Sequence, residues 1–104
     1  MQRLEQIKAF LAENDQDPFL HFALAKEYEK LGQQEEALNC YLKLRDGFTD
    51  YVGTYYHLGK LYESLSKFEE AMHAYEAGIA IARQAGDQHS LSELQGAKMN
   101  LDIL

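Results

Sequence analysis

Four histidines and one cysteine are the side chains of this chain best suited to metal binding or nucleophilic chemistry. They are His21, His57, His73, His89 and Cys40. No pair of histidines has the spacing of a zinc-binding HExxH motif, and the single cysteine has no second one in a CxxC arrangement. The sequence therefore predicts no catalytic residue, no metal site and no cofactor.

Two pairs of neighbouring carboxylates are the other candidates for chemistry. Glu35-Glu36 and Glu69-Glu70 each follow a turn-like break and open a stretch with helical periodicity. Negative charge in the first turn of a helix interacts favourably with the helix dipole. That role is favoured over acid–base catalysis, and with no glycine-rich phosphate loop in the chain we expect a protein that is not an enzyme.

An aromatic residue followed four positions later by a lysine occurs twice. Phe22 and Lys26 form the first pair, and Tyr56 and Lys60 form the second, 34 residues further on. On a helix, residues four apart are neighbours, so a ring and an ammonium group can together hold a peptide and its carboxylates. Two alternatives stay open, since Phe22 can be covered by the preceding segment and a row of lysines can simply be solvated.

Helices must position these side chains, because apolar residues recur at helical spacing and strand-like alternation is absent. Pro18 suits a first helical turn, Gly32 and Gly86 suit helix ends, and Asp50 and Asp87 suit helix caps. The predicted fold is all-α, with helices at about 3–13, 18–31, 34–46, 52–65, 68–85 and 88–102.

A repeat of 34 residues is the strongest pattern in the chain. It aligns Leu24 with Leu58, Ala25 with Gly59, Tyr28 with Tyr62, Ala37 with Ala71, and Tyr41 with Tyr75. Backwards, Leu4 aligns with Leu38, so the first helix looks like half of an incomplete preceding repeat. Forwards the register slips, and the last helix looks like a degenerate cap.

This pattern resembles the tetratricopeptide repeat family. The matching residues are Leu24-Ala25, Tyr28, Gly32, Ala37 and Tyr41 in the first copy, and Tyr55, Leu58-Gly59, Tyr62, Ala71, Tyr75 and Ile79 in the second. The resemblance implies a right-handed solenoid of antiparallel helix pairs. It implies one domain over 1–104, made of a half-repeat helix (1–16), two repeats (18–51 and 52–85) and a capping helix (87–104).

Small residues at positions 25/59 and 37/71 are expected where two helices approach closely. A larger side chain would overpack such a crossing by roughly 1–3 kcal/mol. That exceeds the cost of a glycine within a helix, about 1 kcal/mol. The tyrosine pairs are expected to fill the space between neighbouring repeats. The predicted repeat-packing residues are Leu24, Ala25, Tyr28, Ala37, Tyr41, Leu58, Gly59, Tyr62, Ala71 and Tyr75.

The resemblance also implies the function: a non-catalytic adaptor or scaffold that binds a protein segment in a concave groove lined by the first helix of each repeat. By family register the groove residues are Phe19, Phe22, Lys26 and Glu29, then Tyr56, Lys60 and Glu63. The alternative is self-association into a homodimer through exposed end helices, with apolar residues Leu91, Leu94, Leu101 and Ile103 in the last one.

Charge and hydropathy reduce the classes of partner that we expect for this chain. The formal net charge is −7, without a Lys/Arg cluster, so nucleic acid is not expected as a partner. The N-terminal segment carries charges throughout, and no apolar run reaches the ~18 residues that span a membrane. The lone cysteine fits a reducing compartment. We expect a cytoplasmic protein whose partner is an unidentified protein or peptide.

Overall fold

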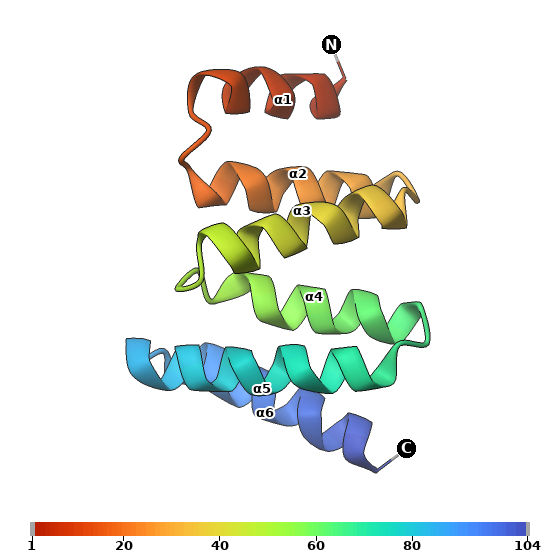
Figure 1. The fold of residues 1–104 in the computed structure, drawn as a ribbon, viewed down its shortest axis with the longest axis vertical. Helices are drawn as coiled ribbons and strands as arrows, with labels where there is room; N and C mark the ends of the chain where they lie inside the picture. The colour runs from red at the N-terminus through yellow and green to blue at the C-terminus, as the bar shows by residue number, and fades with distance from the viewer. Residues whose placement is uncertain (1, 104) are drawn as a thin grey trace. The chain divides into compact units, whose positions relative to one another are not determined.

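The computed structural model describes residues 2–103, and every regular element in that range is an α-helix. The helices are α1 (Arg3–Glu13), α2 (Pro18–Lys30), α3 (Gln34–Gly47), α4 (Gly53–Ser64), α5 (Phe68–Ala85) and α6 (Gln88–Asp102) (Figure 1). The predicted all-α fold is confirmed, and each predicted helix is present with ends that agree closely.

Most of the predicted helix ends are confirmed. Pro18 stands in the first turn of α2, while Gly32 and Gly86 have left-handed φ values of +76° and +69°. The Asp87 carboxylate accepts a hydrogen bond from the backbone N–H of Ser90 at 3.0 Å, which caps α6. These residues end or begin helices for the reasons of backbone geometry and hydrogen bonding that the sequence predicts.

Two helix ends differ from expectation. The prediction that Asp50 caps the fourth helix is wrong, because α4 begins at Gly53 and Val52 occupies the N-cap position. Ser66 adopts a left-handed φ of 59°, although it is not a glycine. Ser66 is the 34-residue counterpart of Gly32, so the turn between the two helices has the same backbone conformation in both repeats.

The chain forms two compact units, Met1–Phe48 and Thr49–Leu104. The division lies close to the predicted repeat boundary between residues 51 and 52. In the N-terminal unit α1 packs on α2, and α2 packs on α3. Its buried core consists of Ile7, Ala25, Ala37, Tyr41 and Leu44.

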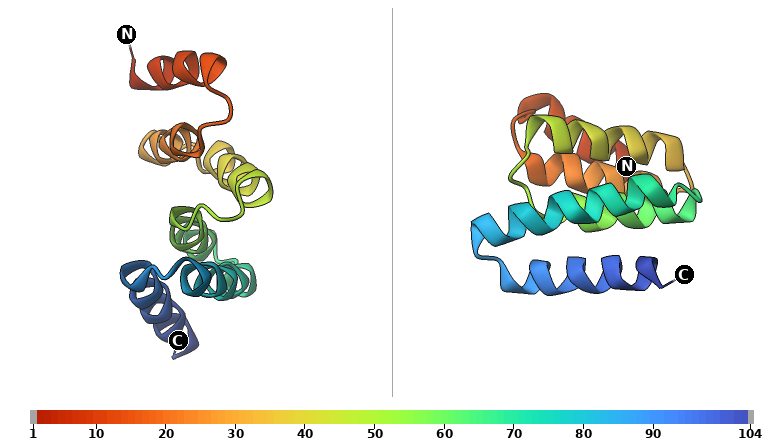
Figure 2. Two further views of the ribbon diagram at one scale, coloured as in Figure 1. Left: turned by 90° about the vertical axis from the view of Figure 1, so that its left-hand side faces the viewer. Right: turned by 60° about the horizontal axis from the view of Figure 1, so that its bottom comes forward.

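In the C-terminal unit α5 packs on both α4 and α6, and α6 also contacts α4. The helices α5 and α6 run antiparallel, so the end of α6 lies beside the start of α5 (Figure 2). The centre of this unit is a cluster of buried residues: Tyr55, Ala71, Tyr75, Ile79, Ala82, Leu94 and Ala97. The last helix therefore contributes to the same core as the second repeat.

The close approach of α4 and α5 occurs at Gly59. A Cβ atom added there would lie 2.2 Å from Cε1 of the Tyr75 ring. Gly78 on α5 is a second such place, where a Cβ would lie 2.4 Å from Cβ of Tyr55. Neither glycine has a positive φ, so each is needed for its small size rather than for its backbone freedom. Close packing against Tyr75 thus accounts for a glycine at position 59.

We predict that Gly59→Ala lowers the free energy of unfolding by about 1–2 kcal/mol. The added methyl group must displace the buried Tyr75 ring, at roughly 1–3 kcal/mol for overpacking. The higher helix propensity of alanine offsets less than about 1 kcal/mol of that cost. Urea denaturation followed by circular dichroism measures the difference.

Gly96→Ala is the matched control. Gly96 lies within α6, and a Cβ there would meet no atom within 4 Å. The same substitution should therefore stabilise the protein by roughly 0.5–1 kcal/mol, through helix propensity alone. Equal effects of the two substitutions would contradict the packing role of Gly59.

Candidate partner-binding surface

One face of α2 carries two aromatic residues and two lysines at helical spacing. Phe19, Phe22, Lys26 and Lys30 follow one another by three or four positions, so they line up along the helix. They border a hollow of about 570 Å³ in the N-terminal unit. The remaining lining residues are Arg3, Ala23, Glu27 and Glu29. The aromatic end is open to solvent, since Phe19 is 60% exposed.

The charges of this hollow are partly paired. The Arg3 guanidinium lies 3.3 Å from the carboxylate of Glu27, whose side chain is only 9% exposed. The Lys26 ammonium lies 3.9 Å from the carboxylate of Glu29 on the same helix. The lining contains three cationic and two anionic side chains, so it carries a net charge of +1 on a chain of −7.

A glutamate of the first helix accepts a hydrogen bond from a tyrosine of the second helix in both repeats. The Tyr41 hydroxyl donates to the Glu29 carboxylate, and the Tyr75 hydroxyl donates to the Glu63 carboxylate. Burial is the main cause that raises the pKa of both tyrosines above its ordinary value, and the adjacent carboxylate adds to it. Glu29 and Glu63, expected to face a partner, thus also hold their own helix pair together.

The corresponding face of α4 is smaller. The Lys60 ammonium lies 5.8 Å from the centre of the Tyr56 ring and 4.0 Å from the Glu63 carboxylate. Gly53 and Ser64 stand where α2 has Phe19 and Lys30. The second copy therefore repeats the central aromatic–lysine–glutamate group and lacks the aromatic and the cation at the two ends.

The structure brings the predicted residues together in two groups. Phe19, Phe22, Lys26 and Glu29 line one hollow, while Tyr56, Lys60 and Glu63 lie on α4. Sequence reasoning missed Arg3, Ala23, Glu27 and Lys30. Lys30 follows Lys26 by four positions, and this helical spacing could have identified it as part of the same face. Nothing in the sequence marks Arg3, because its place at the hollow depends on how α1 packs on α2.

The predicted repeat-packing residues also fall into two groups. Seven of them are buried: Ala25, Ala37, Tyr41, Leu58, Gly59, Ala71 and Tyr75. Leu24, Tyr28 and Tyr62 are only partly buried, and the Lys8 ammonium lies 5.7 Å from the centre of the Tyr28 ring. The hydroxyls of Tyr41 and Tyr75 bond to glutamates of their own repeats, so each tyrosine joins the two helices of one repeat.

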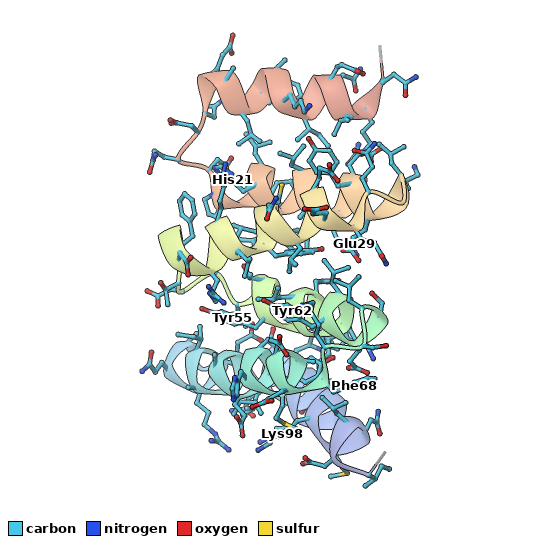
Figure 3. The ribbon with its side chains drawn as sticks, turned by 45° about the vertical axis from the view of Figure 1, so that its right-hand side comes forward. His21, Glu29, Tyr55, Tyr62, Phe68 and Lys98 are labelled. Carbon is cyan, nitrogen blue, oxygen red and sulfur yellow. The ribbon has the colours of Figure 1, made fainter. Side chains whose placement is uncertain are left out.

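The histidine and cysteine side chains that were first considered for chemistry lie in ordinary packing and hydrogen-bonding environments where the structure describes them. The His21 ring shares a 2.7 Å hydrogen bond with the carbonyl oxygen of Asp15 and lies 5.4 Å from the Phe48 ring (Figure 3). Cys40 is partly buried, and this burial raises the pKa of its thiol. Within residues 2–103 no three histidine, cysteine or carboxylate side chains are placed to hold a metal ion.

None of the described helices is both long and apolar enough to cross a lipid bilayer. The surface of α2 presents charged and aromatic side chains. Aromatic residues are enriched at protein–protein contacts and are frequent among the residues that carry most of the binding energy.

This chain is similar in sequence and structure to known proteins. The sequence model of the tetratricopeptide repeat family matches residues 20–44 and 52–84. A tetratricopeptide repeat domain protein from Salinibacter ruber, solved by NMR, is 48% identical, with a TM-score of 0.82, over 85% of this chain and 89% of that chain. Its crystal structure gives 47% identity and the same TM-score over 86% of this chain and 99% of that chain.

A protein from Bordetella parapertussis, solved in solution, is 29% identical with a TM-score of 0.82, over 98% of this chain and 89% of that chain. The search among curated proteins found no match. The similarity thus extends over nearly the whole chain, including the first and last helices.

We predict that Tyr75→Phe destabilises the protein by about 1–2 kcal/mol at neutral pH, because a hydrogen bond to a carboxylate is lost. The pKa of Tyr75 is raised in the folded state, whereas an unfolded tyrosine ionises near its ordinary pKa of 10.0. This contribution is complete below that pH and is lost as the pH rises above it. Urea denaturation between pH 7 and about 11.5 should show wild-type stability falling more steeply than that of the variant.

Tyr62→Phe is the control, since Tyr62 is a partly buried tyrosine of α4 that takes no part in the contact with Glu63. It should change neutral stability little. Parallel alkaline losses in wild type and Tyr75→Phe would show that the Tyr75 hydroxyl does not contribute as described.

Proposed function

Because the chain belongs to the tetratricopeptide repeat family, we propose that it is a non-catalytic interaction module that binds a protein segment on the first helices of its repeats, α2 and α4. The hollow beside α2 carries this proposal. It combines an exposed aromatic residue, Phe19, with a row of cations that ends at Lys30. The family supplies the general role, and these residues supply the surface.

The chemistry of the hollow favours a segment that presents an apolar side chain and a carboxylate. Rings of Phe19 and Phe22 offer apolar area at one end, and Lys26 and Lys30 offer ammonium groups along the same face. A few anchor residues carry most of the binding energy of many protein interfaces, and aromatic residues are frequent among them. The Tyr56 and Lys60 pair on α4 offers the same combination a second time.

Self-association through α6 is less well supported than this surface. Of the four apolar residues expected to mediate it, Leu94 is buried in the core of its own unit, and Leu91 and Leu101 pack partly against that core. Ile103 is exposed. Fewer apolar side chains at the end of the chain are therefore available for an isologous dimer interface than the sequence predicts.

We predict that Phe19→Ala/Lys26→Ala lowers recovery of the bound protein by at least about tenfold. The measurement is affinity purification from the native cell, with bound proteins quantified by mass spectrometry. Both side chains are exposed, so the variant should keep the helical content and unfolding midpoint of wild type.

Phe10→Ala/Lys43→Ala is the matched control, since it removes the same two residue types from exposed positions of α1 and α3. It should retain the partner. Undiminished recovery by a folded Phe19→Ala/Lys26→Ala protein would rule out the α2 surface as the binding site.

A further inference from the structure

A second hollow, of about 580 Å³, lies in the C-terminal unit between the start of α5 and the end of α6. Its described lining residues are Phe68, Glu69 and Met72 of α5, and Leu101 and Asp102 of α6. They meet because the two helices run antiparallel (Figure 2). None of them belongs to α2 or α4, so this hollow is separate from the surface proposed above.

The floor and margins of this hollow are apolar and accessible. Phe68 is 49% exposed and stands one helical turn before Met72. Met99 of α6, one helical turn before Asp102, is 65% exposed, and Ile103, which follows the end of α6, is 78% exposed. The apolar lining of the hollow is Phe68, Met72 and Leu101, and an apolar surface bordered by polar residues is a common feature of interaction sites.

The rim of the hollow is negatively charged. Glu69 and Asp102 contribute a carboxylate from each helix, and no described lining residue is cationic. Lys98 precedes Asp102 by one turn, and its ammonium group lies 3.5 Å from the carboxylate of Glu76 (Figure 3). Lys67 precedes Phe68 in the chain but does not line the hollow. An occupant therefore meets apolar side chains flanked by two carboxylates.

We infer that this hollow binds a basic amphipathic helix of a partner protein. The apolar face of such a helix would cover Phe68 and Met72, and its Lys or Arg side chains would face Glu69 and Asp102. An amphipathic helix that lies in an apolar groove between two helices is a recurring mode of peptide recognition. The opposite charges at the rim select basic helices over acidic ones.

Charge also decides between this occupant and the alternatives. In an isologous dimer the same surface faces itself, which would bring Glu69 and Asp102 of one copy towards those of the other. Like charges in contact disfavour association. Phosphate groups of nucleic acids or anionic lipids would be repelled in the same way.

The test uses the whole chain and a model peptide of ~18 residues, about five helical turns, composed of Leu and Lys in amphipathic order. A peptide of the same length with Glu in place of Lys is the charge-reversed probe. Fluorescence anisotropy of the labelled peptides measures affinity at physiological salt. We expect saturable binding of the Leu/Lys peptide to wild type and no binding of the Leu/Glu peptide.

Two variants test the site itself. Phe68→Ala should weaken binding of the Leu/Lys peptide at least about tenfold, since it removes the aromatic anchor. Glu69→Gln/Asp102→Asn should weaken it about threefold or more, through the loss of two ion pairs. Circular dichroism and thermal unfolding confirm that each variant is folded.

Glu35→Gln/Glu93→Gln is the matched control, because it removes two negative charges at exposed positions outside the hollow. Glu35 is also the 34-residue counterpart of Glu69, in the first turn of α3. The control should bind the Leu/Lys peptide as wild type does. An equal loss of affinity in control and site variants would overturn the inference, since attraction to an acidic protein would then explain binding.

Three further outcomes decide the inference. Absence of Leu/Lys binding to wild type would overturn it. So would light scattering that shows a wild-type dimer which Phe68→Ala converts to monomer, because a second copy would then occupy the hollow. Full binding of the Leu/Lys peptide by Phe19→Ala/Lys26→Ala would support the inference and show that the two surfaces act independently.

Discussion

Within each repeat, the two helices are held together by one tyrosine of the second helix. Its ring packs deep inside the helix pair, and its hydroxyl donates a hydrogen bond to a glutamate of the first helix. In the C-terminal unit the ring of Tyr75 lies so close to the backbone of α4 that a Cβ atom at position 59 would displace it. In the N-terminal unit the corresponding residue, Ala25, is also fully buried. The register of each helix pair depends on this contact.

That register determines which side chains remain for binding. Glu29 and Glu63 point into the contact with tyrosine, and each also lies near the lysine three residues before it. The glutamates therefore order the lysines while they join the helices. On α2, the lysine and its aromatic neighbours open onto a hollow that α1 completes with Arg3. A single tyrosine–carboxylate hydrogen bond thus connects the stability of a repeat to the layout of its surface.

The flanking helices do more than cover the ends of the repeats. α1 supplies Arg3, which compensates the buried charge of Glu27, and so shapes the positive hollow of the N-terminal unit. α6 supplies Leu94 to the core of the C-terminal unit. It also supplies Asp102 to the rim of the negatively charged hollow in that unit. The flanking helices add charges of opposite sign to the two hollows, which increases the difference between their net charges. Each unit thereby offers a surface suited to a different kind of partner segment.

The helices, the 34-residue register and the small residues at the helix crossings could all be predicted from the amino-acid sequence. These depend on local propensity and on spacing along the chain, as Gly59 and its counterpart Ala25 illustrate. It also marked the aromatic–lysine pairs. The bonds from tyrosines to Glu29 and Glu63, and the place of Leu94 in the core, depend instead on how the helices pack in three dimensions. Arg3, Phe68 and Asp102 acquire their roles only where separate helices pack together, and residue spacing within one helix does not predict that packing.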